Sequence, residues 1–330
     1  MTRFAMRKIG LAAAITPALL ALTLVPRGAF ATTSSPASLA LRPSLDAQAA
    51  PQQVVDEAGR RVTIPADVRR IVSLAPNLTE TIYALHAESK LAGDTDYCDV
   101  PADAKSKPHV GVPVSPSLEA IVALKPDLVL ATAINRRETV DALERLGVTV
   151  YALDPHTVED LIAGMARLAD LIGAANEGRD LAARLHARLD ALHTRLEKEP
   201  VRRVLFVVWD DPLISIGPRT FIADALHYAG AESVIDSSQD WPHVSREAVV
   251  RARPEYIVFA NDHGDESADS PADLRARTEW RDLGAVKQGH ITHVSAEIDR
   301  PAPALIDAIE ELAKQLHPGA FENPAAEESR

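Results

Sequence analysis

The stretch Ser117-Leu-Glu-Ala-Ile-Val-Ala-Leu-Lys-Pro-Asp-Leu-Val-Leu130 decides the fold, because the chain contains a second version of it. It returns as Ser245-Arg-Glu-Ala-Val-Val-Arg-Ala-Arg-Pro-Glu-Tyr-Ile-Val258, with Ser, Glu, Ala, Val and Pro at the same places. In each copy a Ser with a Glu two residues later predicts the start of a short apolar helix, and the Pro stops that helix. A buried strand follows, from Asp127 to Leu130 and from Glu255 to Val258. We expect one helix–strand unit in each half of the chain.

Two such units, separated by the length of a domain, predict two similar α/β lobes that face one another. A cleft between lobes is a usual place for a ligand. Strands and helices alternate along both halves, which favours mostly parallel, Rossmann-like sheets. Glu119 and Glu247 occupy matching places in the two copies and would be matching surface features.

The N-terminus predicts export. Arg3, Arg7 and Lys8 precede an apolar run from Ile9 to Val25, and Ala29-Phe-Ala31 suits cleavage, so residues 1–31 are expected to be a signal peptide. A membrane anchor is the competing interpretation, but prolines interrupt and end the run. No Cys follows the run, so no bacterial lipid anchor is expected there. The mature protein is expected in the periplasm.

Charge excludes some partners. Removing the four basic residues of the signal segment leaves 31 basic against 47 acidic residues, which lowers the net charge from −12 to −16. Nucleic acid and anionic lipid are therefore poor partners, and a cationic docking surface suits the chain better. Cys98 is the only cysteine, so no internal disulfide can form.

The sequence divides into segments by composition and periodicity. We expect a flexible leader at 32–53, an N-terminal lobe at 54–156, bridging helices at 157–198, a C-terminal lobe at 199–318 and a disordered tail at 319–330. Joining the lobes by helix predicts a stiff body with limited hinge closure. In the N-terminal lobe we predict a hairpin at 54–64, strands at 70–74, 91–95 and 148–153, and helices at 77–85 and 138–146.

The rest of the chain repeats this scheme. Thr157 is predicted to cap the first bridging helix, a break falls at Ile172-Gly173-Ala174, and the second helix runs from 176 to 197. In the C-terminal lobe we predict strands at 203–208 and 290–294, and helices at 221–229, near 273–280 and at 303–317.

Four segments carry a resemblance to a known family. They are Arg70-Ile-Val-Ser-Leu-Ala-Pro-Asn-Leu-Thr-Glu80, Asp96-Tyr-Cys-Asp-Val-Pro101, the first copy of the repeat, and Trp241-Pro-His-Val-Ser-Arg-Glu247. From about Val54 to Leu316 the chain resembles the extracytoplasmic substrate-binding proteins of ABC importers for cobalamin, haem and ferric siderophores, the class with a helical backbone. Within that class it is most similar to the cobalamin-binding members.

The resemblance implies two docking residues. In the family, one glutamate at the crown of each lobe reaches basic residues of the permease dimer, and the matching positions are Glu119 and Glu247. The internal repeat reaches the same pair independently, because two equivalent groups suit a two-fold partner. The alternative is that each Glu only complements the positive end of its helix, an effect of about 0.3 to 1 kcal/mol.

The resemblance also implies cleft residues. The family positions map onto Tyr97 in the first lobe and Trp241 in the second, and such aromatic side chains suit the flat face of a corrin. Trp209, at the end of a predicted strand, is a further candidate. Cys98 is a candidate lining group because it adjoins Tyr97, and His243 is one because it lies beside Trp241.

Two departures from the best-known cobalamin binders keep other ligands open. A first-lobe loop that carries a tryptophan in those proteins is Gly111-Val-Pro-Val-Ser-Pro116 here, and an acidic cleft residue is replaced within Ser295-Ala-Glu-Ile-Asp-Arg300. Arg300 suits an anionic ligand such as a siderophore or a haem propionate.

Two other classes are weaker interpretations. A zinc or manganese receptor needs several converging His and carboxylates, whereas the eleven His residues here are scattered. An enzyme is disfavoured because no nucleophile elbow or phosphate-binding loop is present, and Cys98 has no basic neighbour in sequence.

We therefore expect a monomeric, non-enzymatic protein with no intrinsic cofactor or metal. It would capture cobalamin or a related corrinoid, or alternatively haem or a ferric siderophore, and deliver it to an ABC permease dimer driven by its ATPase.

Overall fold

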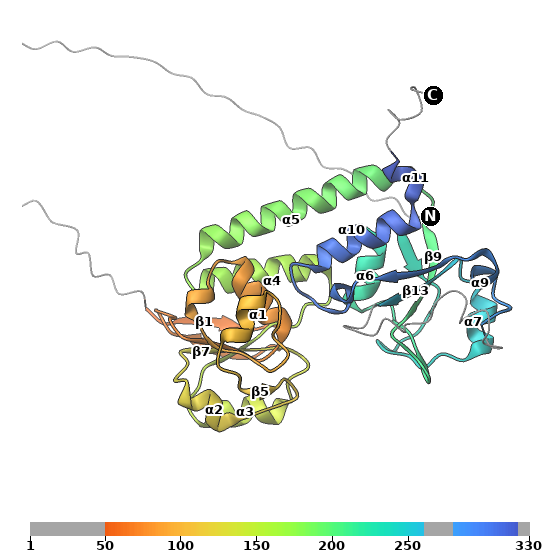
Figure 1. Ribbon diagram of the computed structural model, residues 1–330. Coiled ribbons are helices and arrows are strands. Elements are labelled where there is room, and N and C mark those ends of the chain that lie inside the picture. Colours follow the sequence, from red (N-terminus) through yellow and green to blue (C-terminus); the bar gives the residue numbers. More distant parts are fainter. Residues whose placement is uncertain (1–49, 261–279, 323–330) are drawn as a thin grey trace, which may run out of the picture. The chain divides into compact units, whose positions relative to one another are not determined.

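Two parallel sheets form the frame of the protein in the computed structural model, which describes residues 50–260 and 280–322 (Figure 1). The first sheet has the order β4-β3-β7-β8 and the second β12-β9-β13-β14. The first contains β3 (Ile71–Ser73), β4 (Leu91–Gly93), β7 (Leu128–Ala131) and β8 (Val150–Ala152). The second contains β9 (Arg202–Val207), β12 (Ala231–Ser233), β13 (Tyr256–Ala260) and β14 (Ile291–Val294).

The strand order is the same in both sheets. Counted along the chain, each lobe places its second strand at one edge, then its first, third and fourth, and every neighbouring pair is parallel. The prediction of two α/β lobes with parallel sheets is confirmed. The duplication therefore extends from the fourteen-residue repeat to the whole sheet of each lobe.

The repeated units also match in their helix starts. The first unit forms α2 (Leu118–Ala123) and the second forms α7 (Arg246–Ala252). The Ser117 hydroxyl accepts a hydrogen bond from the Ala120 amide at 3.2 Å, and Ser245 does the same for Ala248 at 3.2 Å. Each serine satisfies one of the free amides at the helix start.

The two units end in the same way. Lys125 and Arg253 both adopt the left-handed conformation, with φ of 48° and 49°. A proline follows each of them, so the helix cannot continue. An arginine at the start of the first strand of each lobe then donates to a carbonyl at the end of the helix. Arg70, directly before β3, donates to Leu124 O, and Arg203 of β9 donates to Ala252 O.

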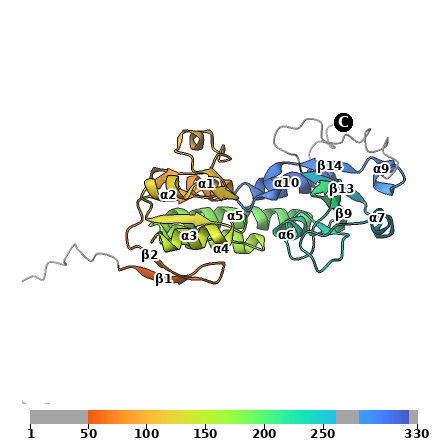
Figure 2. The same ribbon diagram turned by 90° about the horizontal axis from the view of Figure 1, so that it is seen from below.

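Two long helices join the lobes. Thr157 caps α4 (Val158–Leu171) by accepting from the Asp160 amide, as expected, and α5 (Ala175–Leu196) follows a break at Gly173, whose φ is +75°. Helix α5 runs alongside α4 and contacts elements of the C-terminal lobe, including α10 (Leu305–Leu316) (Figures 1 and 2).

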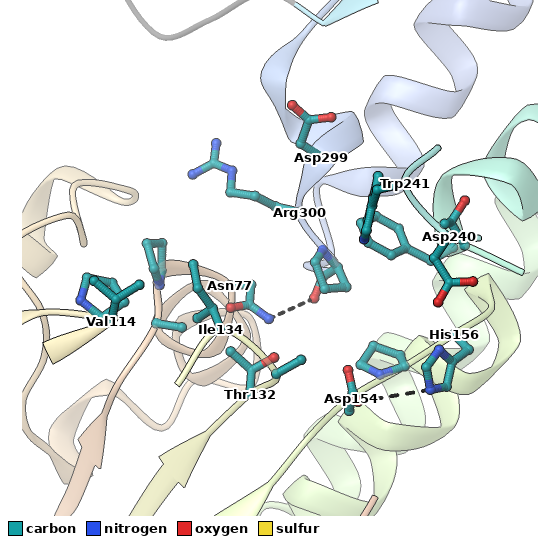
Figure 3. Close-up of a pocket in the computed structure, with 18 of the residues that line it drawn as sticks. Asn77, Val114, Thr132, Ile134, Asp154, His156, Asp240, Trp241, Asp299 and Arg300 are labelled. Carbon is teal, nitrogen blue, oxygen red and sulfur yellow. Dashed lines mark hydrogen bonds and ion pairs between the residues drawn. The ribbon is translucent and has the colours of Figure 1, made fainter. Parts of the chain in front are cut away.

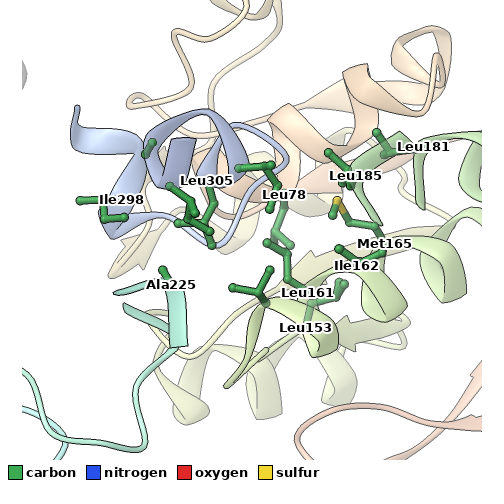
Figure 4. Close-up of a cluster of buried hydrophobic side chains, with 14 of the residues drawn as sticks. Leu78, Leu153, Leu161, Ile162, Met165, Leu181, Leu185, Ala225, Ile298 and Leu305 are labelled. Atoms are coloured by element: carbon green, nitrogen blue, oxygen red, sulfur yellow. The ribbon is translucent and has the colours of Figure 1, made fainter. Parts of the chain in front are cut away.

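The largest hydrophobic core is shared by both lobes. Side chains from α1 (Pro76–Ala84), α4, α5, α10 and α6 (Phe221–Tyr228) form one continuous buried cluster (Figure 4). Smaller separate cores lie on the far side of each sheet, around Ile121 in the first lobe and Val249 in the second. The joining helices are therefore part of the main core.

Shorter elements complete the description. The N-terminal hairpin pairs β1 (Gln52–Val55) with β2 (Arg61–Ile64), and two small ribbons pair β5 (Gly111–Val112) with β6 (Ser115–Pro116) and β10 (Trp209–Asp210) with β11 (Leu213–Ile214). The remaining helices are α3 (Arg137–Arg145), α9 (Gly284–Gln288), α11 (Pro318–Phe321) and the 3₁₀ turns η1 (Glu88–Lys90), η2 (Ala102–Ser106) and η3 (Ala296–Asp299).

The chain ends differ from expectation in two places. Strand β1 begins at Gln52, inside the segment expected to be a flexible leader. Residues 319–321, expected to belong to the disordered tail, are part of the short helix α11, because Phe321 packs on the main core with the Arg195 guanidinium 4.8 Å from its ring centroid. The expected signal peptide and nearly all of the helix near 273–280 lie outside the described residues. Within 50–260 and 280–322, no helix is both long and apolar enough to cross a membrane.

Candidate functional site

A cavity of about 710 Å³ lies between the two lobes (Figure 3). Its lining comes from chain segments that follow the carboxyl ends of the strands, which is where ligands of parallel α/β sheets usually bind. The first lobe provides Ala75, Pro76, Asn77, Tyr97, Val112, Pro113, Val114, Thr132, Ala133, Ile134, Asp154, Pro155 and His156, and the second provides Arg219, Thr220, Phe221, Asp240, Trp241, Asp299, Arg300 and Pro301.

Large apolar side chains on the two sides of the cavity remain exposed. Tyr97 of the first lobe is 62% exposed and Trp241 of the second is 47% exposed. Val114 and Ile134, also in the lining contributed by the first lobe, are exposed as well. Aromatic rings left open to solvent in a concave site offer apolar area that a flat ligand can bury. The cavity is therefore suited to a ligand with broad apolar faces.

Both arginines in the lining are paired with carboxylates. Arg219 Nη2 lies 3.1 Å from Asp240 Oδ1 and also donates to the Ser238 carbonyl. Arg300 Nη1 lies 3.1 Å from Glu80 Oε1, and its Nη2 lies 3.4 Å from Glu297 Oε1. The carboxylates in these pairs neutralise the positive charge of the arginines, which an anionic ligand would need for binding.

The ion pair between Arg300 and Glu80 connects the lobes. Glu80 lies on α1 of the first lobe, and Arg300 follows η3 of the second. Asn77, one turn before Glu80, donates to the Pro301 carbonyl at 3.4 Å (Figure 3). A polar contact between lobes thus forms one wall of the cavity.

Burial dominates the acidity of Glu80. Desolvation raises the pKa of its carboxyl to about 7, the charge of Arg300 opposes this rise, and Glu297 and Asp99 add to it. The carboxyl therefore gains or loses its proton near neutral pH. Sequence reasoning missed Glu80 and Asn77, although both fall inside the segment Arg70 to Glu80 that carried the family resemblance.

The cavity brings together three of the residues expected in the cleft, Tyr97, Trp241 and Arg300. Trp209 is outside the lining: its indole Nε1 donates to the Asp211 carbonyl at 2.8 Å in the β10–β11 turn. His243 is exposed, also outside the lining, and pairs by a backbone bridge with Ile214.

Cys98 is buried and does not line the cavity. Its sulfur lies 3.2 Å from the hydroxyls of both Thr79 and Thr95. Burial raises the pKa of the thiol, with the two threonine hydroxyls opposing the rise. Cys98 thus helps to hold the loop that presents Tyr97.

The loop that departs from the family pattern contributes apolar lining. Val112, Pro113 and Val114 of this loop line the cavity. A hydrogen bond from the Asn135 side chain to the Pro113 carbonyl, 2.8 Å long, fixes this loop. The wall is apolar but less bulky than an indole would make it.

Glu119 and Glu247 are exposed and lie outside the cavity. The Ser117 hydroxyl donates to Glu119 Oε2 at 3.2 Å. The pKa of Glu247 is lowered by a hydrogen bond from its own backbone amide and by the Ser245 hydroxyl. Each carboxylate is thus held at the start of its repeated helix.

The histidines gather at no metal site in the described ranges, which contain no group of three or more His, Cys, Asp or Glu arranged to hold a metal ion. His290 stacks on Tyr256 with ring centroids 4.6 Å apart, and His293 stacks on Phe259 at 5.4 Å.

Comparison with known proteins agrees with this architecture. The family model for periplasmic binding proteins matches residues 71–297. An uncharacterized ABC transporter substrate-binding lipoprotein of Bacillus subtilis is 27% identical over 280 residues, covering 82% of this chain and 87% of that protein.

Two solved structures share the fold and differ in ligand. The periplasmic vitamin B12-binding protein of Vibrio cholerae has a TM-score of 0.67 and 26% identity, covering 78% of this chain and 99% of that one. A periplasmic haem-binding protein solved with two haems has a TM-score of 0.68 and 25% identity, covering 76% and 98%. The chain belongs to the periplasmic binding protein family.

Proposed function

We propose that this protein captures cobalamin, or a related corrinoid, in the cavity between its lobes and delivers it to an ABC importer. The observation that carries the proposal is a cavity with an exposed aromatic from each lobe and two arginines that are already paired with carboxylates. The relatives that bind vitamin B12 and the relative named as an ABC transporter component support the same conclusion.

The charge pattern of the cavity separates the ligand classes. The propionates of haem and the acidic groups of many siderophores require cationic partners. Here Asp240 and Glu80 already hold the lining arginines, and Asp154 and Asp299 add further acid to the walls. Cobalamin carries amides around its corrin ring, and these neutral groups are not repelled by the acidic side chains of the cavity.

Arg300 holds one donor without an acceptor. Its buried Nε has no hydrogen-bond partner within the described residues. A buried donor without a partner costs about 1–3 kcal/mol, so a movement of the Arg300 side chain that brings this Nε to an amide carbonyl of a corrin would recover that cost. Haem is the second candidate, because a haem-binding protein of this family shares the fold.

The two glutamates would connect capture to delivery. Glu119 and Glu247 lie at equivalent positions in the two lobes and would meet basic groups on the two subunits of a permease dimer. Charges at the rim of an interface act mainly on approach and orientation. The shared core of α4, α5 and α10 would limit the change in lobe angle on ligand binding, so that recognition depends on the preformed cavity.

Calorimetric titration of the purified mature protein tests the ligand. We expect saturable heat with cyanocobalamin, and weaker or no heat with haemin and a ferric hydroxamate. Preferred binding of haemin would replace the corrinoid by the second candidate. No heat and no thermal shift with any of the three would overturn the macrocycle proposal. A stoichiometric metal ion retained through dialysis would indicate a metal-transport protein instead.

Uptake assays test delivery separately. The double variant Glu119→Ala/Glu247→Ala should bind cyanocobalamin like the wild type and fail to restore uptake in a host strain that lacks the wild-type gene. Loss of ligand binding in this variant would contradict the assignment, because both residues lie outside the cavity.

A further inference from the structure

The repeated helices share a second exposed residue besides the glutamate. Position six of the repeat is Val122 in the first copy and Val250 in the second. These valines are 40% and 56% exposed, whereas the preceding residues Ile121 and Val249 are buried in their lobes. In each short helix, the first of two adjacent aliphatic side chains is thus buried in its own lobe and the second is exposed to solvent.

The exposed valine lies on the same face as the glutamate. Three residues along an α-helix correspond to a rotation of about 300°, so positions i and i+3 are neighbours on the helix surface. Glu119 and Val122 therefore form one acidic–apolar point on α2, and Glu247 with Val250 forms the equivalent point on α7. Both helices lie at the periphery of their lobes, away from α5 (Figures 1 and 2).

The pattern of identity between the copies singles out these two positions. Of the five identical residues, Ala and Pro are at most partly exposed, and the exposed Ser is occupied in capping the helix. The other exposed places of the two helices differ, as at Ala123 against Arg251. Folding does not require a valine in solvent, so its presence at the same place twice calls for a partner that is itself duplicated.

We propose that each acidic–apolar point docks onto one subunit of the permease dimer, with the glutamate meeting a basic group and the valine filling an apolar recess one turn along the helix. This inference rests on the proposed function, since it assigns the partner's surface in the same delivery step. Two equal points on pseudo-equivalent lobes match a partner with two-fold symmetry. A negatively charged membrane surface would instead repel both glutamates.

Spheroplasts of the host strain lacking this gene provide the test. Purified protein is added at increasing concentration, and the uptake rate of labelled cyanocobalamin, or of haemin if the titration selects it, gives the concentration for half-maximal uptake. We expect Val122→Ser and Val250→Ser each to raise this concentration roughly three- to tenfold, as expected for losing part of a buried valine at an interface. The double variant should show the product of the two effects, and ligand affinity should not change.

Two controls separate docking from general effects. Val201→Ser alters a valine that is 55% exposed but lies outside the repeat, and it should behave like the wild type. Raising the ionic strength should shrink the effect of Glu119→Gln/Glu247→Gln, because salt screens exposed charges, and should leave the valine effect in place.

The outcomes distinguish this inference from the function on which it rests. If the valine variants match the wild type while Glu119→Gln/Glu247→Gln blocks uptake, the apolar contact is overturned and delivery through the glutamates stands. If neither set changes uptake, docking through the repeated helices is overturned altogether. An effect confined to one valine would contradict the two equivalent points.

Discussion

The two lobes are alike where they carry the repeated helices and unlike where they line the cavity. Strand order, serine caps and left-handed helix ends agree between them. In contrast, the connection from the second strand to the repeated helix is long in the first lobe, from Gly93 to Ser117, and short in the second, from Ser233 to Ser245. Both connections supply cavity residues, Tyr97 and Trp241 among them.

This difference has a physical interpretation. A partner with two equal halves requires the same surface twice, whereas a ligand without internal symmetry requires different walls on its two sides. The molecule holds its duplicated geometry in regular elements and places its variation in loops at the carboxyl ends of the strands, where changes disturb packing least.

The largest expected effect tests whether the lobes are energetically one unit. Leu168 of α4 is fully buried in the shared core, so Leu168→Ala should lower the free energy of unfolding by about 2–5 kcal/mol. All three tryptophans lie in the second lobe, at 209, 241 and 280. Tryptophan fluorescence should therefore follow that lobe, while circular dichroism follows both.

In a denaturant titration of Leu168→Ala, we expect the two signals to shift together. Ile121→Ala, in the separate core of the first lobe, should shift them together as well if the shared core couples the lobes. A fluorescence transition that stays at the wild-type midpoint would show lobes that unfold independently. Leu146→Ala, on an exposed side chain, serves as the control and should change stability by less than about 0.5 kcal/mol.

The next effect is a pH dependence of stability that arises in the first lobe. The two carboxyls with the largest upward pKa shifts among the described residues, Glu80 at about 7 and Asp94 at about 6, both lie in the first lobe. A raised carboxyl pKa means that the folded state holds its proton more tightly than the unfolded state. The contribution of Glu80 to the free energy of unfolding is therefore complete below about pH 4.5 and is lost as the pH rises through about 7.

Glu80→Gln should reduce this pH-dependent loss of stability, whose upper limit is about 3.5 kcal/mol at roughly 1.4 kcal/mol per pKa unit. The measurement is the free energy of unfolding at pH 5 and pH 8 for both proteins. His317 acts in the opposite direction, because burial lowers its pKa and its contribution is lost as pH falls. An unchanged difference between the two pH values in Glu80→Gln would contradict the assignment.

The aromatic side chains give a smaller and ligand-dependent effect. Trp241→Ala and Tyr97→Ala should each weaken cyanocobalamin binding by about 1–2 kcal/mol, because each removes an aromatic contact from one side of the ligand. Trp209→Ala is the matched control, since Trp209 is exposed and lies outside the cavity lining. Calorimetry that finds the control as damaging as Trp241→Ala would place the ligand elsewhere.

The smallest effect concerns the left-handed residues that end the repeated helices. A residue with a Cβ is strained at positive φ, so Lys125→Gly and Arg253→Gly should each stabilise the protein by up to about 1 kcal/mol. Replacement of either residue by Ala keeps the strain and should not stabilise. Thermal unfolding should show similar gains in both lobes, and a gain in one lobe only would break the equivalence of the two units.

Much of the fold was predictable from sequence because its signals are local. Ser117 and Ser245 predict helix starts, Gly173 predicts the break between the bridging helices, and the apolar runs predict the parallel strands. The core arrangement was less accessible, because α4, α5 and α10 bury leucines against elements from both ends of the chain. Phe321 likewise stabilises α11 through contacts with the main core, and these contacts cannot be predicted from the local sequence.

The site was predictable only in part. Tyr97, Trp241 and Arg300 line the cavity as expected, but one of the two carboxylates that pair with Arg300 is Glu80, more than two hundred residues earlier. A salt bridge across two lobes has no sequence periodicity. Trp209 was a reasonable candidate by strand position, yet a turn hydrogen bond to Asp211 keeps its indole outside the lining.

The shared core also determines how the polypeptide can be divided. A cut between Glu197 and Val201 would leave α4 and α5 in one piece and α6 and α10 in the other, each with a leucine-rich face uncovered. Neither piece would be a soluble half-protein. Produced together, the two pieces would bury those faces against each other, which makes this junction a natural place to design a fragment-complementation reporter.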